Sequence, residues 1–111
     1  IVDDFKNFSG SIAHGAEPNG KLDIYGKTPA ACELLDGVFL AASKNTLRES
    51  GLLFDTLFDF HFYDLDFCRR ATQLGLKVGT WPICLTHQSG GAFGTADWEK
   101  GRLNYFGKWG S

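Results

Sequence analysis

The sequence contains no methionine, only three prolines, and no pair of cysteines separated by two residues. The missing cysteine pair argues against a zinc site, because zinc sites in proteins usually draw on closely spaced ligands. No apolar run approaches the length of a membrane-spanning helix, so we expect no transmembrane segment. The first residues lack a basic stretch followed by an apolar core and lack a methionine, so we expect neither a signal peptide nor a native start at residue 1.

An excess of positive charge is also missing. The formal net charge is -2, and the lysines and arginines are scattered along the chain. Nucleic-acid binders usually concentrate basic residues in one patch, so we do not expect a nucleic-acid partner. The three cysteines, Cys32, Cys68 and Cys84, are odd in number and widely spaced. We interpret them as buried thiols in a reducing compartment, which favours a cytoplasmic location, with peripheral attachment to a membrane left open.

What the sequence does contain suits one small folded domain. It has 111 residues, of which 43% are hydrophobic and 22% charged, and ten of them are phenylalanine. Residues 1–33 are rich in Gly, Asn, Pro and Ser and show no sustained period, so we interpret them as a loop-rich lead-in with a turn at Pro18-Asn19-Gly20. So long a loop is normally functional or packed against another part of a protein. The remaining residues, 34–111, form the predicted ordered part.

Hydrophobic periodicity and helix-stop signals define the elements of this ordered part. The pattern predicts an α/β or α+β fold with a small sheet and about three helices. Glycines at positions 51 and 75 fit the ends of two of these helices, and Thr95 fits the start of the last one. The predicted elements are a buried strand within 34–42, helices over 44–50 and 63–74, short strands over 76–81 and 83–86, and a helix from 95 to about 108.

The most informative stretch is the one that carries Asp64 and Asp66 among phenylalanines, at the start of the second predicted helix. A charged carboxylate beside so much apolar surface is costly unless it is paired or has a chemical role. Asp66 precedes Arg70 by four residues, the favourable order for a pair on a helix surface, so we assign Asp66 a structural role. For Asp64 two interpretations remain, a first-turn acid that stabilises the helix and a group that takes part in chemistry.

Five segments, in this order and at this spacing, resemble the C-terminal half of a family-two glycosyltransferase, an enzyme with the GT-A fold. The resemblance covers roughly residues 34 to 109. The segments are Leu35-Asp36-Gly37-Val38-Phe39-Leu40, Gly51-Leu52-Leu53-Phe54-Asp55-Thr56-Leu57-Phe58, Phe62-Tyr63-Asp64-Leu65-Asp66-Phe67-Cys68-Arg69-Arg70, Gly75-Leu76-Lys77-Val78 and Leu85-Thr86-His87-Gln88-Ser89-Gly90-Gly91.

The resemblance implies a partial GT-A fold and transfer of a sugar, with inversion, from a nucleotide-sugar donor to a carbohydrate or other hydroxyl acceptor. Inverting members of the family carry a Glu-Asp pair at the start of the corresponding helix, and the aspartate is the general base. Here the pair reads Tyr63-Asp64, so the aspartate is kept and the glutamate is replaced. The resemblance therefore assigns the base to Asp64, which would accept the proton of the attacking hydroxyl.

Other positions receive roles from the resemblance, each beside a simpler interpretation. Asp36-Gly37 resembles the acceptor-side turn, or is a bulge with a solvated aspartate. His87 lies where many such enzymes hold a histidine near the metal or the diphosphate, or is a strand-end histidine bonded to backbone. Trp81 is a candidate for stacking on the acceptor sugar, or is a core residue. His61 would orient the acceptor, or bond to a backbone carbonyl.

The family places its donor-binding half first, ending in an Asp-x-Asp motif that holds a divalent metal, Mn²⁺ or Mg²⁺. That half is absent from the 111 residues, so we expect no transferase activity from this chain alone, and measurable sugar transfer would refute this. The face left by the missing half would be apolar and would favour self-association. Two alternatives are a non-catalytic carbohydrate-binding or protein-interaction module derived from the same fold, and a structural domain without a ligand.

Overall fold

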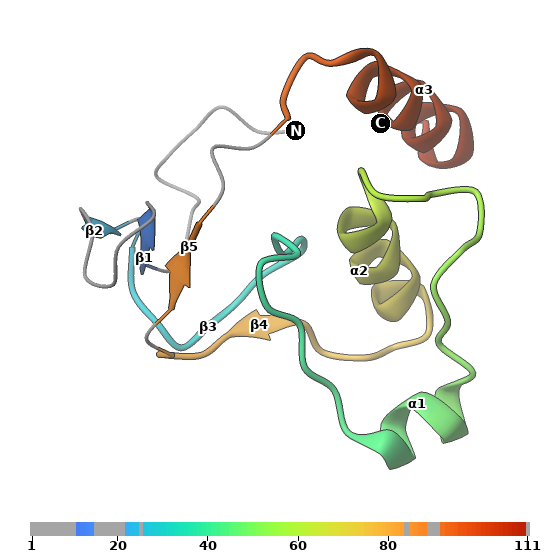
Figure 1. Cartoon of the computed structure of the whole chain (residues 1–111). Helices are drawn as coiled ribbons and strands as arrows, with labels where there is room; N and C mark the ends of the chain where they lie inside the picture. Colours follow the sequence, from blue (N-terminus) through green and yellow to red (C-terminus); the bar gives the residue numbers. More distant parts are fainter. Residues whose placement is uncertain (1–10, 15–21, 25, 84, 89–91, 111) are drawn as a thin grey trace. The chain divides into compact units, whose positions relative to one another are not determined.

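The computed structural model describes residues 11–14, 22–24, 26–83, 85–88 and 92–110. Within these residues the chain is a small mixed α/β protein with three helices and five short strands (Figure 1). It divides into two compact units, each built from two separate stretches of chain. Unit 1 comprises Ile1–Cys32 and Gly79–Gly91, and unit 2 comprises Glu33–Val78 and Ala92–Ser111.

Unit 1 contains the strands. β1 (Ser11–His14) pairs antiparallel with β2 (Leu22–Ile24) and parallel with β5 (Thr86–His87), so β1 is the central strand of a three-stranded sheet. The interpretation of residues 1–33 as a loop-rich lead-in is therefore wrong at β1 and β2, which are strands. Strands of two to four residues are too short to show an alternating pattern, and backbone pairing with distant partners forms them. The turn expected at Pro18-Asn19-Gly20 lies outside the described residues.

A second sheet in unit 1 pairs β3 (Ala30–Ala31) antiparallel with β4 (Gly79–Thr80). Gly79 is required there, because a β-carbon at this position would lie 2.7 Å from the carbonyl oxygen of Ala30. The strand expected over 76–81 is confirmed at residues 79 and 80 only. The strand expected over 83–86 appears as β5, which is shifted toward the C-terminus and begins at Thr86.

Unit 2 contains the helices, and their ends follow the signals in the sequence. α1 (Lys44–Ser50) begins at the Ser43 cap and ends at Gly51, which takes a positive φ of 71°. α2 spans Tyr63–Gln73, and α3 spans Ala96–Trp109 with the Thr95 hydroxyl accepting from the Trp98 N–H. All three predicted helices are thus confirmed to within a residue or two. None of the helices in the described part of the chain has the length and apolar character that crossing a membrane requires.

The core of unit 2 lies between α2, α3 and the loop that precedes α2. Phe58, Phe62 and Tyr105 form its buried centre. The indoles of Trp98 and Trp109 pack against this cluster while partly buried, as expected for core aromatics. Cys68 is also buried, whereas Cys32 is half-buried and Cys84 lies outside the described residues.

The strand expected within residues 34–42 does not form. Residues 37 and 38 make a turn instead, and Oδ1 of Asp36 accepts a hydrogen bond from the backbone N–H of Val38 at 3.2 Å. This local bond from an aspartate side chain to the backbone two residues on competes with strand pairing. The turn brings Gly37 to the start of α2.

Candidate functional site

The start of α2 and the turn at Gly37 are joined by a short hydrogen bond. The backbone N–H of Gly37 donates to Oδ2 of Asp64 at 2.6 Å, across 27 positions of sequence. Asp64 belongs to the first turn of α2, and its other oxygen, Oδ1, accepts from the N–H of Leu65 at 2.9 Å. Both oxygens of the Asp64 carboxylate are therefore fixed in direction by backbone donors.

Tyr63 reaches the same glycine from the neighbouring position on the helix. Its hydroxyl donates to the carbonyl oxygen of Gly37 at 3.3 Å. A β-carbon on Gly37 would collide with that hydroxyl and would lie 2.9 Å from Cζ of Tyr63 and 3.0 Å from Oδ2 of Asp64. Only glycine therefore leaves room for both side chains at this position.

α2 begins from a strained residue. Phe62, which precedes Tyr63, adopts a left-handed backbone with φ of 66° and ψ of 0°, a conformation that is rare for a bulky side chain. It offers no side-chain cap to the helix, and Asp64 partly replaces that cap through Leu65. Packing holds Phe62 in place, because the centroid of its ring lies 5.2 Å from the ring centroid of Trp98 and 5.6 Å from that of Tyr105. Such strain persists only where surrounding packing imposes it, and it is common beside functional groups.

Burial and nearby charge act on the titration of both side chains at the Gly37 turn. Burial raises the pKa of Asp64 above its usual value, and the negative charge of Asp36 raises it further, while the N–H groups of Leu65 and Gly37 oppose the shift. Burial also raises the pKa of Tyr63, with the charges of Asp64 and Asp36 adding to it. Tyr63 therefore stays protonated as a donor, while the Asp64 carboxyl holds a proton more strongly than a solvated aspartate does.

The pairing expected for Asp66 is wrong, although its structural role is confirmed. Asp66 is 1% exposed and therefore does not lie on the helix surface. Its Oδ1 contacts Nζ of Lys108 at 2.7 Å and accepts from the indole N–H of Trp109 at 2.9 Å. Arg70 is exposed and donates to Gln73 instead. The buried carboxylate turns inward because α3 supplies a cation and an N–H donor there.

Lys108 also reaches a second acid. Its Nζ lies 2.7 Å from Oδ2 of Asp55, so one ammonium group joins the end of α3 both to α2 and to the loop before it. Burial of Lys108 works against its charge, but the hydrogen bonds to Asp55 and Asp66 raise its pKa overall. This network stabilises the position of α2, and through it the position of Asp64.

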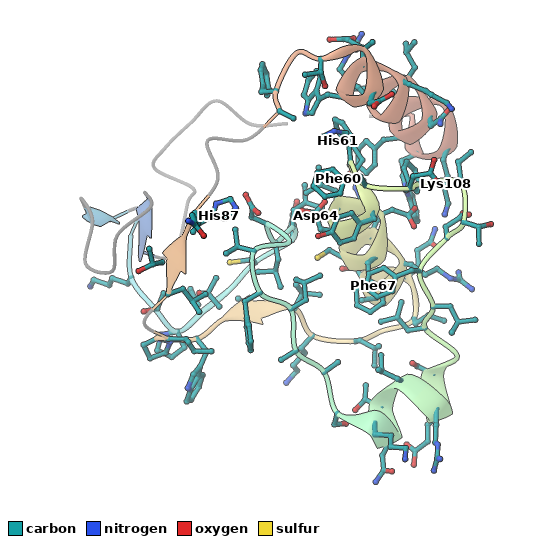
Figure 2. All side chains as sticks on the ribbon, viewed as in Figure 1. Phe60, His61, Asp64, Phe67, His87 and Lys108 are labelled. Atoms are coloured by element: carbon teal, nitrogen blue, oxygen red, sulfur yellow. The ribbon has the colours of Figure 1, made fainter. Side chains whose placement is uncertain are left out.

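The remaining predicted site residues are His61, His87 and Trp81. His61 packs against α3, where a β-carbon on Gly101 would lie 3.2 Å from its own (Figure 2). The His61 ring makes an edge contact with Phe60 at 4.9 Å between ring centroids. His87 ends β5 and Trp81 is 72% exposed, and both belong to unit 1. Within unit 2, Gly37 and Asp64 are the predicted residues that meet, and Asp36 precedes Gly37 in the turn.

A divalent metal was expected in the complete enzyme. In the part of the chain that the structure describes, no group of three or more His, Cys, Asp and Glu side chains is arranged to hold a metal ion. The residues at the Gly37 turn supply only two carboxylates, and one of them is already bonded to two backbone donors. These residues therefore do not fit a metal ion by themselves.

Two features of the site are not signalled by the sequence. Tyr63 is one of them, because only the folded chain brings its hydroxyl to the carbonyl oxygen of Gly37. Phe54 belongs to an apolar run of ambiguous structure, and its ring stacks on Phe67 with centroids 4.2 Å apart.

Comparisons with protein-family models, with curated proteins and with solved structures gave no match to this chain.

Proposed function

We propose that this chain is the acceptor-side part of an inverting glycosyltransferase and that Asp64 is its general base. The observation that supports the proposal is the hydrogen bond between Gly37 and Asp64. The two motifs lie 27 positions apart, and the resemblance places both of them at the acceptor side of the enzyme. Their meeting is what an acceptor site with a positioned carboxylate requires.

The proposed step uses Asp64 as follows. The acceptor hydroxyl gives its proton to an Asp64 oxygen while the acceptor oxygen forms a bond to the anomeric carbon of the donor. The bond from that carbon to the diphosphate oxygen breaks, and the nucleoside diphosphate leaves with the electron pair. Each carboxylate oxygen has two lone pairs, so one hydrogen bond to each still leaves room to accept the proton. The raised pKa of Asp64 makes it a better base than a solvated aspartate.

A second function is favoured by the same hydrogen bonds. Because Gly37 and Leu65 already donate to Asp64, the carboxylate also suits a purely structural link in a non-catalytic carbohydrate-binding or protein-interaction module. In that case Asp64 would fix the turn, and the ligand would be bound without reaction.

The substitution Asp64→Asn separates the two functions. It is tested in the full natural chain that carries this sequence, with radiolabelled UDP- and GDP-sugars and simple glycosides as acceptors. The glycosyltransferase proposal expects turnover to fall by about 10²-fold or more with donor binding kept. Asp59→Asn, at an exposed aspartate of the loop that precedes α2, is the matched control and should leave turnover unchanged. Transfer that survives Asp64→Asn, or no transfer by the unaltered chain from any of these donors, would overturn the proposal.

A divalent metal remains part of the proposal for the complete enzyme, with His87 as one ligand. A nucleotide-sugar is the proposed donor. Metal dependence is tested by the loss of transfer on chelation and its return with Mn²⁺ or Mg²⁺. Transfer at an unchanged rate in a chelator would contradict this part of the proposal and leave the role of Asp64 standing.

A further inference from the structure

An exposed aromatic surface adjoins the Gly37 turn, and neither motif reasoning nor the proposed base accounts for it. Phe54 is 54% exposed, although its side chain is wholly apolar. Its ring is stacked on that of Phe67, with centroids 4.2 Å apart and planes 20° apart. One face of the Phe54 ring is thus covered by Phe67, so the exposed area belongs to the opposite face and the edges.

Tyr63 connects this ring to the carboxylates. The ring of Tyr63 lies 5.9 Å from that of Phe54 at an angle of 59°, so the two rings form a corner. The hydroxyl of Tyr63 donates to Gly37, whose N–H donates to Asp64. The exposed Asp36 carboxylate precedes Gly37 in the same turn. Contacts within unit 2 therefore link the open face of Phe54 through Tyr63 and Gly37 to the Asp64 carboxylate, and the Asp36 carboxylate is the neighbour of Gly37 in the turn.

We propose that Phe54 and Tyr63 form a platform for the ring of a sugar acceptor, so that the hydroxyl acceptor of the proposed enzyme is a carbohydrate. One face of a pyranose carries C–H groups and is apolar, and it suits an open aromatic face. The hydroxyls at its rim are donors, and Asp36 and Asp64 retain lone pairs that accept from them. An aliphatic or lipid alcohol would use the apolar surface but leave these acceptors without donors.

The role of the bound sugar as an acceptor rests on the proposed function. The binding of the sugar itself is measured without any donor. Saturation-transfer NMR on the full natural chain, with the methyl glycosides of glucose, galactose, mannose and N-acetylglucosamine as probes, reports which ring protons touch the protein. The platform predicts that C–H protons of one ring face are saturated in at least one glycoside. Phe54→Ala should weaken that binding by about tenfold.

Two variants make the result specific to the aromatic ring. Leu53→Ala removes a side chain that is 77% exposed beside Phe54 and should leave sugar binding unchanged. Phe54→Trp keeps an aromatic face and should retain binding. Equal loss in Phe54→Ala and Leu53→Ala, no saturation of any glycoside, or a change from dimer to monomer in Phe54→Ala would overturn the platform, the last by identifying the surface as a contact between copies.

The two proposals fail in different ways. If Phe54→Ala abolishes glycoside binding but no transfer occurs in the unaltered chain, the platform stands and the glycosyltransferase proposal falls. If Asp64→Asn abolishes transfer while Phe54→Ala leaves both transfer and binding intact, the base stands and the platform falls.

Discussion

The backbone N–H of Gly37 and the carboxylate of Asp64 meet at 2.6 Å, and no other residue type at position 37 would let them do so. This contact joins a turn to the first turn of a helix that begins 26 positions later. The same contact holds the half-buried Asp64 carboxylate in one orientation, whereas the carboxylate of a solvated surface acid turns freely.

Replacing Gly37 with alanine should therefore destabilise the protein. The new methyl group would collide with the Tyr63 hydroxyl and crowd Asp64, and the hydrogen bond between position 37 and Asp64 would lengthen. We expect a loss of about 1–3 kcal/mol in the free energy of unfolding, measured by urea denaturation.

Gly107→Ala is a matched control for that substitution. A β-carbon on Gly107 would meet nothing within 4 Å, and the residue lies inside α3. Alanine there should raise the free energy of unfolding by about 0.5–1 kcal/mol, because glycine is unfavourable in a helix interior. An equal loss of stability at both positions would show that the lack of space for a β-carbon at Gly37 is not what destabilises Gly37→Ala.

The raised pKa of Asp64 gives stability a definite dependence on pH. Because the folded state binds the Asp64 proton more tightly than the unfolded chain does, this carboxyl contributes most when it is protonated. Its contribution should fall as pH rises from 3.8, the ordinary pKa of an aspartate, up through the higher pKa of the folded state. Urea unfolding is measured for the unaltered chain and for Asp64→Asn between about pH 3 and pH 7. The difference between their free energies of unfolding gives the contribution of the Asp64 carboxyl at each pH.

The sign of that difference is the test. The unaltered chain should lose stability relative to Asp64→Asn as pH increases across this window. A relative gain of stability with rising pH would mean that the hydrogen bonds from Gly37 and Leu65 outweigh burial, and that Asp64 is a weaker base than proposed.

The ion pair between Lys108 and Asp66 should contribute more to the free energy of unfolding than the location of Lys108 at the end of α3 suggests. Lys108→Met would leave the Asp66 carboxylate, which is 1% exposed, without its cation. We expect a loss of about 2 kcal/mol or more in the free energy of unfolding, because among the described residues the buried charge would keep only its bond to Trp109.

Lys100→Met provides the comparison for Lys108. Lys100 is exposed on the same helix, and its replacement should change the free energy of unfolding by less than about 0.5 kcal/mol. Similar values for the two variants, measured by the same urea denaturation, would contradict a structural role for the ion pair.

The helices could be predicted because their signals are local. Ser43 and Thr95 cap the nearest N–H groups, and Gly51 takes the left-handed conformation that ends α1. These effects act within one turn of chain, so neighbouring residues suffice to place them. The strands of unit 1 could not be predicted in the same way, because β1 depends on β2 and β5, which come later in the chain.

The same distinction applies to the candidate site. The order of the motifs indicated that Asp36, Gly37 and Asp64 belong to one site, and the structure places Gly37 and Asp64 in contact. The partner of Asp66 was missed, because a rule for neighbours on one helix selects Arg70, whereas α3 brings Lys108 from 42 positions away. Burial decides between such partners, and burial depends on how the helices pack.

The sequence by itself determined where the helices begin and end, because caps and glycine stops act over three or four residues. The tertiary structure alone decided that Asp66 is buried, that Phe62 is strained, and that Phe54 keeps one ring face open beside Tyr63. Each of these properties depends on which distant side chain covers a given surface, and that choice is made only when separate segments pack together.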